Sequence, residues 1–199
     1  MLFRSRFRLG QKTNVELPET AGVIIPPTEV EGNAVRYSNM SFGQGMDVTM
    51  VQVAAGFSAI INGGVYYQPT VLAGTVENGI FKAQAPKVID GQVVKNTTST
   101  QVRQMLTEAR RLYYKNVDRA GYEIGGKTGT SEKIVDGKYV ENQTIATYLG
   151  YGGTNRPEYV IMIRVDGKGK YLAGNTDAAP IFTDISNWLI DYLKLYPKE

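Results

Sequence analysis

The chain has 199 residues, the length of one ordinary domain or of a large part of a bigger one. It has no histidine and no cysteine, which excludes a Ser-His-Asp triad, a thiol nucleophile, a disulfide and a His- or Cys-ligated metal within it. Its net charge of +3, from 22 basic and 19 acidic residues, is small and scattered, so we predict no nucleic-acid partner. Any covalent catalysis must therefore use a hydroxyl group activated by a lysine or a carboxylate.

The clearest element of the first half is a buried helix. Residues 48–61 are apolar around nearly the whole circumference of a helix, a pattern typical of a buried helix. Thr49 or Asp47 can cap its start, and the Asn-Gly-Gly of residues 62–64 can end it. A glycine-flanked turn at residues 41–45 precedes it. We therefore expect a capped helix in the core.

Extended sequence follows this helix. Residues 65–76 predict an extended segment, and the polar stretch after them contains two dipeptides that favour tight turns, Asn78-Gly79 and Asp90-Gly91. We therefore expect short hairpins in this part of the chain.

A second helix is predicted over residues 97–116. Its apolar residues follow an i, i+3, i+4, i+7 spacing, which indicates one face turned to the core. They are Val102, Met105, Leu106, Ala109 and Leu112. The charged residues that lie largely outside this stripe are Arg103, Glu108, Arg110 and Arg111.

The last third predicts an antiparallel meander closed by a helix. One strand ends before the turn at residues 136–137, and two more cover residues 144–151 and 159–165. A helix over about residues 177–195 presents an apolar face on which we expect Trp188 to be a core residue. Helices followed by consecutive strands predict an α+β fold, with an antiparallel sheet packed against helices.

The stretch before and around Lys127 is open to two interpretations, and the first is a nucleotide site. Gly121-x-x-x-x-Gly126-Lys127-Thr128 satisfies the phosphate-loop pattern. Such a loop needs a buried strand before it and a helix after it, because the helix N-terminus and the loop N–H groups hold the phosphates. Residues 114–120 do not predict a buried strand, and the residues after Thr128 are poor helix formers. The context therefore disfavours a phosphate loop.

The second interpretation places Lys127, Thr128, Gly129 and Thr130 on a strand at the edge of a cleft. Alternation along a strand puts Thr128 and Thr130 on one face, where two hydroxyl groups can hold a substrate carboxylate. Gly129 lets an extended peptide approach the strand edge, and backbone N–H groups there can stabilise an oxyanion. Lys127 supplies positive charge for a carboxylate, or exchanges a proton with a neighbouring serine.

Here the sequence resembles the penicillin-binding transpeptidases. Their third signature, Lys-Thr/Ser-Gly, matches Lys127-Thr128-Gly129. The Phe-Gly-Gln-Gly segment that begins at Phe42 resembles one that class B penicillin-binding proteins carry well before this signature. Other segments that resemble the family, in the family's order, are residues 10–18, 62–64 and 178–182. The resemblance covers nearly the whole chain.

The family's other two signatures, Ser-x-x-Lys and Ser-x-Asn, do not occur in this sequence. The resemblance therefore implies that residues 1–199 are the C-terminal part of one transpeptidase domain, with the nucleophile on an N-terminal part outside them. In the family a serine attacks the D-Ala-D-Ala carbonyl of a stem peptide, forms an acyl-enzyme and passes the acyl group to an amine. The resemblance implies that Lys127 is catalytic, that Thr128, Gly129 and Thr130 bind the substrate, and that the protein uses no cofactor or metal. We expect the chain alone to be inactive.

The resemblance also implies partners and a location. The partners are the peptidoglycan stem peptide, β-lactams, the N-terminal half of the domain and the machinery of cell division or elongation. The location is the cell envelope, at the outer face of the cytoplasmic membrane, with the anchor outside this chain. Two alternatives remain: a non-catalytic penicillin-sensing or scaffold relative, and the phosphate-loop protein. A β-lactamase is disfavoured because no deacylating base can be identified.

Overall fold

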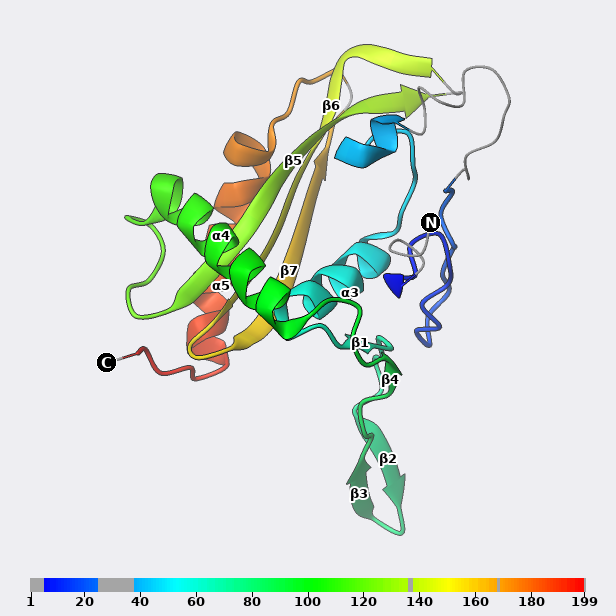
Figure 1. Cartoon of the computed structure of the whole chain (residues 1–199), viewed down its shortest axis with the longest axis vertical. Coiled ribbons are helices and arrows are strands. Elements are labelled where there is room, and N and C mark those ends of the chain that lie inside the picture. Colours follow the sequence, from blue (N-terminus) through cyan, green and yellow to red (C-terminus); the bar gives the residue numbers. More distant parts are fainter. Residues whose placement is uncertain (1–5, 25–37, 136–137, 168, 199) are drawn as a thin grey trace. The chain divides into compact units, whose positions relative to one another are not determined.

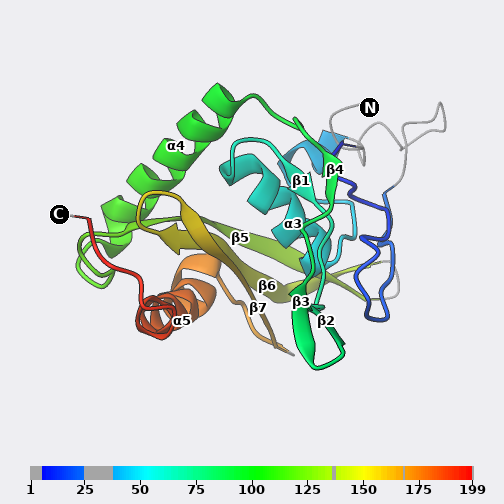
Figure 2. The ribbon, with the colours of Figure 1, turned by 90° about the horizontal axis from the view of Figure 1, so that it is seen from below.

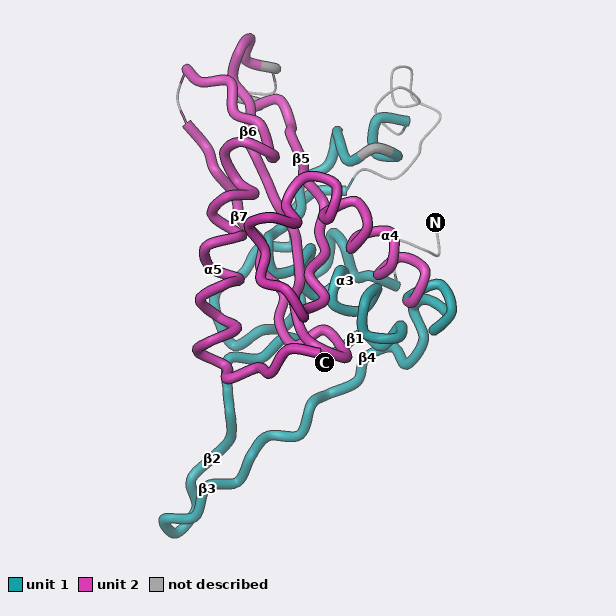
Figure 3. The backbone as a smooth tube through the Cα atoms, turned by 90° about the vertical axis from the view of Figure 1, so that its left-hand side faces the viewer, with its two compact units in different colours: residues 1–99 teal, residues 100–199 magenta. Residues whose placement is uncertain are grey.

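The computed structural model describes residues 6–24, 38–135, 138–167 and 169–198. The chain forms two compact units, Met1–Ser99 and Thr100–Glu199, which Figure 3 shows in teal and magenta. Each unit has a hydrophobic cluster of its own. Across the described residues, no helix is both long enough and apolar enough to cross a bilayer.

The first unit is built around helix α3 (Met50–Ile61), which the sequence predicts (Figure 1). Thr49 caps it through a reciprocal capping box with Gln52, so Thr49 rather than Asp47 is the cap. The Gln52 side chain is fully buried and also donates a hydrogen bond to the Ala21 carbonyl oxygen at 2.8 Å. A 3₁₀ turn, η1 (Met40–Phe42), precedes α3. The cluster of this unit contains Phe7, Ala59, Tyr66 and Val93.

Of the two hairpin turns predicted between residues 77 and 96, one is confirmed, and the turn predicted at residues 136–137 lies outside the described residues. β2 (Gly74–Glu77) pairs with β3 (Ile80–Ala83) around Asn78 and Gly79, whose φ values of 52° and 77° are those of a tight hairpin turn. The second prediction is wrong, because the strand before Gly91 does not turn back on itself. Instead, β4 (Val88–Asp90) pairs with β1 (Tyr66–Tyr67).

Helix α4 (Asn96–Tyr114) forms where the sequence predicts it, but its buried face differs from the predicted one. Met105 is 67% exposed and Leu112 is 79% exposed, whereas Thr107 and Arg110 are buried. The reason is that buried tyrosine hydroxyl groups lie opposite this helix, and they require polar partners. The polar side of α4 therefore faces the interior.

The second unit contains the predicted antiparallel meander. Its strands are β5 (Glu123–Val135), β6 (Lys138–Gly153) and β7 (Pro157–Asp166), in the order β5-β6-β7. A π-helical turn, η2 (Gly174–Ala178), leads into α5 (Ala179–Tyr192). α5 packs against β6 and β7 (Figure 2). These elements confirm the predicted α+β class.

The predicted burial of Trp188 is wrong. Trp188 is 57% exposed and stacks on Tyr192, with ring centroids 4.8 Å apart. The buried side of α5 consists of Ala179, Phe182, Thr183, Ser186 and Ile190. Ser186 is small and its hydroxyl group has a partner in Tyr159, 2.7 Å away, so this polar position can face the sheet closely. Apolar periodicity alone therefore selected the wrong side of α5.

Candidate functional site

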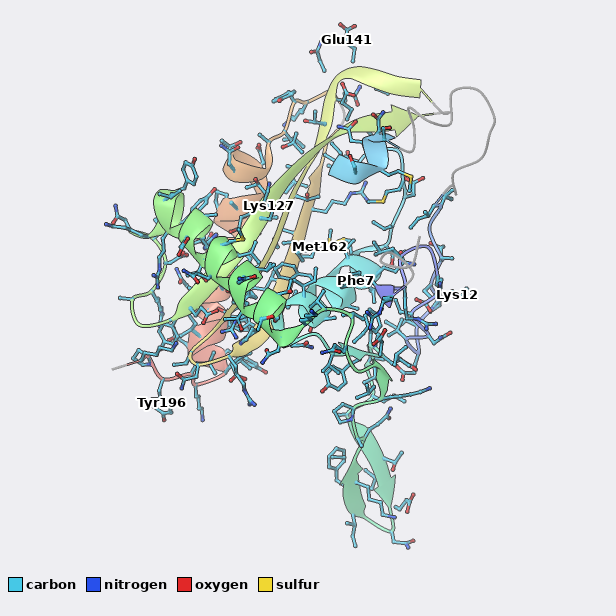
Figure 4. The ribbon with its side chains drawn as sticks, viewed as in Figure 1. Phe7, Lys12, Lys127, Glu141, Met162 and Tyr196 are labelled. Carbon is cyan, nitrogen blue, oxygen red and sulfur yellow. The ribbon has the colours of Figure 1, made fainter. Side chains whose placement is uncertain are left out.

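The Lys-Thr-Gly-Thr sequence lies in the middle of β5. The strand runs without interruption from Glu123 to Val135, so no helix begins at Lys127 (Figure 4). The helix that a phosphate loop needs is therefore missing from this position, and that interpretation is wrong despite the matching letters.

β5 is an edge strand of the three-stranded sheet described for this unit. It pairs with β6 on one side, and this ladder sets Lys127 opposite Leu149 and Thr128 opposite Tyr148. An edge strand presents backbone N–H and C=O groups to which an extended peptide can add. The edge of β5 thus has the geometry for binding a peptide.

Alternation along β5 distributes the four predicted site residues over both faces of the strand. Thr128 and Thr130 lie on one face, as predicted, and Lys127 and Gly129 on the other. The Thr130 Oγ1 accepts a hydrogen bond of 3.2 Å from the Gly174 amide, so its own O–H remains able to donate. The exposed Lys127 donates from Nζ to the Thr128 carbonyl oxygen at 2.7 Å. The ammonium group therefore lies close to the strand backbone.

The turn η2 approaches β5 very closely. A β-carbon on Gly174 would lie 2.6 Å from the carbonyl oxygens of both Gly129 and Thr147, so only glycine fits there without a shift. The next residue, Asn175, accepts a hydrogen bond of 3.1 Å from the Tyr114 hydroxyl group through its carbonyl oxygen. No local sequence pattern predicts the contact between η2 and Thr130.

A cavity of about 530 Å³ lies next to the site strand. Gly126, Lys127 and Thr128 contribute to its wall from β5, and α4 contributes Arg110 and Tyr114. Its volume is in the range of small-molecule pockets. Another cavity, of about 600 Å³, is lined by charged groups such as Arg103 and Glu123 that already pair with each other, and it does not include Lys127. The smaller cavity is therefore the one relevant to the predicted site.

Arg110 is a buried residue in the wall of this cavity and holds several elements together. Its side chain is 0% exposed and forms a two-pronged ion pair with Asp118, at 2.7 and 2.6 Å. Nη1 donates to the Tyr148 hydroxyl group at 2.7 Å, and Nη2 donates to the Thr183 hydroxyl group at 2.9 Å. Burial opposes the charge, but the hydrogen bonds and charge of Asp118 outweigh it and raise the pKa of Arg110. The guanidinium group therefore stays charged.

Three aromatic rings surround this guanidinium group. Its central carbon lies 4.6 Å from the ring centroid of Tyr114, 5.2 Å from that of Tyr148 and 4.6 Å from that of Phe182. Rings at this distance stabilise a cation through their π faces. The apolar stripe predicted for this helix leaves Arg110 outside the core. The polar residues Arg103, Thr107, Arg110 and Tyr114 recur at helical spacing, and this second stripe was the signal that could have located it.

A second polar network ties the start of β5 to the same helix. The buried Tyr151 hydroxyl group bonds Glu123 at 2.9 Å and Thr107 at 3.0 Å. Arg103 forms an ion pair with Glu123 at 2.6 Å. Burial raises the pKa of Tyr151 to about 12. α4 is thus attached to β5 and β6 through hydroxyl and charged groups.

The described residues contain no cluster of three or more acidic side chains that could hold a metal ion. The chemical groups that residues 127–130 of the site strand offer are one ammonium group, two hydroxyl groups and an edge of backbone amides. These groups suit the binding of a peptide that carries a carboxylate.

Comparison with known proteins gives one consistent result. A family model, the penicillin binding protein transpeptidase domain, matches residues 3–187. Stage V sporulation protein D of Bacillus subtilis is 35% identical over 97% of this chain, which covers 30% of that protein. PbpB of Mycobacterium tuberculosis is 32% identical over 93% of this chain, which covers 29% of it. The chain thus spans about 30% of the length of these curated relatives.

A solved structure shows the same fold. Penicillin binding protein 3 of Mycobacterium tuberculosis, crystallised with ampicillin, aligns with a TM-score of 0.81 at 30% identity. The alignment covers 98% of this chain and 46% of that one. Because the family model matches most of the sequence and the fold agrees, the chain belongs to the penicillin-binding protein transpeptidase domain family.

Proposed function

We propose that the protein containing this chain is a peptidoglycan D,D-transpeptidase, and that residues 1–199 are the C-terminal part of its transpeptidase domain. The observation that carries the proposal is the Lys-Thr-Gly-Thr sequence on the exposed edge of β5 in a member of this family. The attacking serine belongs to a Ser-x-x-Lys signature in the rest of the parent protein, where it forms an acyl-enzyme with the stem peptide.

The geometry of β5 supports a division of roles among the four residues. A substrate that pairs along the strand edge lies between the two faces, within reach of the Lys127 ammonium group and of the hydroxyl groups of Thr128 and Thr130. The hydroxyl groups bind the substrate carboxylate, and Lys127 provides positive charge and assists proton transfer at the serine. Gly129 leaves the edge unobstructed. β-Lactams, one of which is present in the related structure, bind in the same place.

The proposed transpeptidase function implies specific partners and a location in the cell. The substrate is the stem peptide, and the partners are the N-terminal half of the domain and the proteins of cell division or elongation. The chemistry takes place in the cell envelope, at the outer face of the cytoplasmic membrane. The isolated chain lacks the nucleophile, so it neither reacts with penicillin nor turns over substrate.

The test is covalent labelling of the full-length protein by a fluorescent penicillin. We expect the wild-type protein to be labelled, the isolated 199-residue chain not to be labelled, and Lys127→Ala to slow labelling by about 100-fold or more. Lys133→Ala is the matched control, because Lys133 lies on the same strand but pairs with Asp166 at 2.9 Å. It should be labelled at the wild-type rate.

Two other outcomes would contradict the proposal. Labelling of the isolated chain would place a nucleophile within these 199 residues. A full-length protein that has no Ser-x-x-Lys and is not labelled would be the non-catalytic relative, a penicillin-sensing or scaffold protein.

A further inference from the structure

The ring of Tyr148 packs against the strand that carries the predicted site. A β-carbon on Gly126 would lie 2.6 Å from the Tyr148 ring and hydroxyl group, so this ring is in direct contact with the backbone of β5 just before Lys127. Tyr148 is 2% exposed and is the ladder partner of Thr128. Tyr148 also lines the cavity of about 530 Å³, together with Gly126, Lys127 and Thr128 of the strand.

Arg110 fixes the position of that ring. It donates a hydrogen bond to the Tyr148 hydroxyl group at 2.7 Å, and its guanidinium carbon lies 5.2 Å from the ring centroid. Arg110 is itself held by both oxygens of Asp118 and by Thr183. A cation with this many partners has one favoured position, and the Tyr148 ring is held relative to it.

A second path leads from Arg110 to the other end of the site. Arg110 stacks on Tyr114, 4.6 Å from its ring centroid, and the Tyr114 hydroxyl group donates to the Asn175 carbonyl oxygen in η2. The neighbouring Gly174 amide donates to the Thr130 Oγ1. The two paths therefore reach Gly126 and Thr130, the residues on either side of Lys127-Thr128-Gly129.

We propose that Arg110 is a positioning residue for the site strand, and that it sets the place of residues 126–130 through Tyr148 at one end and through Tyr114 and η2 at the other. The inference deepens the proposed function, on which it rests. Arg110 does not touch the reacting groups in this proposal. It keeps the hydroxyl groups of Thr128 and Thr130 and the ammonium group of Lys127 in the geometry that the reaction requires, where a displacement of about 1 Å can cost two orders of magnitude in rate.

Tyr148→Phe is the variant that isolates this effect. It removes one oxygen atom and the hydrogen bond to Arg110, and it keeps the ring against Gly126. Arg110→Met would instead leave Asp118, which is only 11% exposed, without its partner, and the loss of folding would obscure the result. Tyr159→Phe is the matched control. It removes a hydroxyl group bonded to Ser186 in the same unit, from β7, which is separated from β5 by β6.

The measurement is the kinetics of penicillin labelling in the full-length protein, with affinity, acylation rate and labelled fraction determined separately. We expect Tyr148→Phe to lower the acylation rate by roughly 3- to 10-fold more than it lowers the affinity for penicillin. The fraction of the protein that becomes labelled should not change. Tyr159→Phe should keep the wild-type rate. A purely structural role for Arg110 would reduce the fraction of protein that reacts but leave its rate unchanged, and that result would overturn the proposal.

Amide hydrogen exchange of β5 provides a readout that does not depend on catalysis. Exchange across residues 126–130 should become roughly fivefold faster in Tyr148→Phe, as expected for the loss of one hydrogen bond, and should not change in Tyr159→Phe. If the wild-type protein is not labelled by penicillin, the proposed function fails, and hydrogen exchange still decides the inference about Arg110. Equal exchange in both variants would refute it.

Discussion

Replacement of Gly174 by alanine tests how closely η2 must approach the site strand. The added β-carbon would lie 2.6 Å from the carbonyl oxygens of Gly129 and Thr147, and 2.9 Å from the Gly129 nitrogen. These atoms belong to the backbones of two paired strands, so they cannot move away as the end of a flexible side chain can. The turn η2 must therefore move instead, which breaks the 3.2 Å hydrogen bond from the Gly174 amide to Thr130.

The size of the effect follows from these two changes. Insertion of a methyl group into a close-packed contact costs about 1–3 kcal/mol. Loss of one hydrogen bond adds about 1 kcal/mol. We therefore expect Gly174→Ala to lower the free energy of local opening at η2 and β5 by about 2–4 kcal/mol. Penicillin labelling should slow as well, because the Thr130 hydroxyl group loses the donor that orients it.

The assay is amide hydrogen exchange in the full-length protein, which reports local opening for each segment. Gly91→Ala is the control, because a β-carbon at Gly91 would have no neighbour within 4 Å. This control should change the free energy of opening by no more than about 0.5 kcal/mol. If hydrogen exchange at η2 and β5 is unchanged in Gly174→Ala, the close approach of η2 to β5 does not require glycine at position 174, and the reasoning is refuted.

Three further predictions concern a cap and two ionisable groups. Thr49→Ala removes the hydroxyl group that accepts from the Gln52 amide at 3.2 Å, so hydrogen exchange should show α3 less stable by about 1 kcal/mol. Burial opposes the charge of Glu123, but hydrogen bonds from Arg103 outweigh burial and lower the pKa of Glu123. The ionised Glu123 therefore contributes to stability above the ordinary pKa of 4.5, and this contribution is lost as the pH falls through the lowered pKa. Acid denaturation of Glu123→Gln should lack this component. Burial raises the pKa of Tyr151 from 10 to about 12. Its contribution to folding stability is therefore complete below pH 10 and is lost as the pH rises through 12. Tyr151→Phe should remove one late step from an ultraviolet titration of the tyrosines.

Elements with strong local signals could be predicted from the sequence. The capping residue Thr49 was one of two candidates, and the capping box with Gln52 decides between them. The Asn78-Gly79 turn formed because glycine and asparagine tolerate the positive φ values that a tight hairpin needs. The strand at Lys127 was predicted because small and β-branched residues follow it where a phosphate loop needs a helix. In each case the deciding information lies within a few residues.

Elements whose position depends on distant partners could not be predicted in this way. Asp90 resembles a turn residue, but Tyr66 of β1 pairs with it, and its carboxylate accepts from Arg6 at 3.0 Å. Trp188 is a large apolar residue, but the sheet packs against the side of α5 that contains Ser186. A local pattern specifies the helix or the strand, and the partner then selects the face.

The misassigned face of α4 shows what kind of pattern could correct such errors. Tyr148 and Tyr151 are three residues apart on β6, so they lie on opposite faces of the sheet. Each is fully or nearly fully buried, and a buried hydroxyl group needs a hydrogen-bond partner.

α4 supplies these partners from one stripe, with Thr107 bonded to Tyr151 and Arg110 bonded to Tyr148. One helix can serve both faces of a sheet only near its edge, and β5 is the edge that carries Lys127. The tyrosines of β6 therefore require polar residues at helical spacing on the preceding helix, and this requirement, rather than apolar periodicity, places α4 beside the site strand.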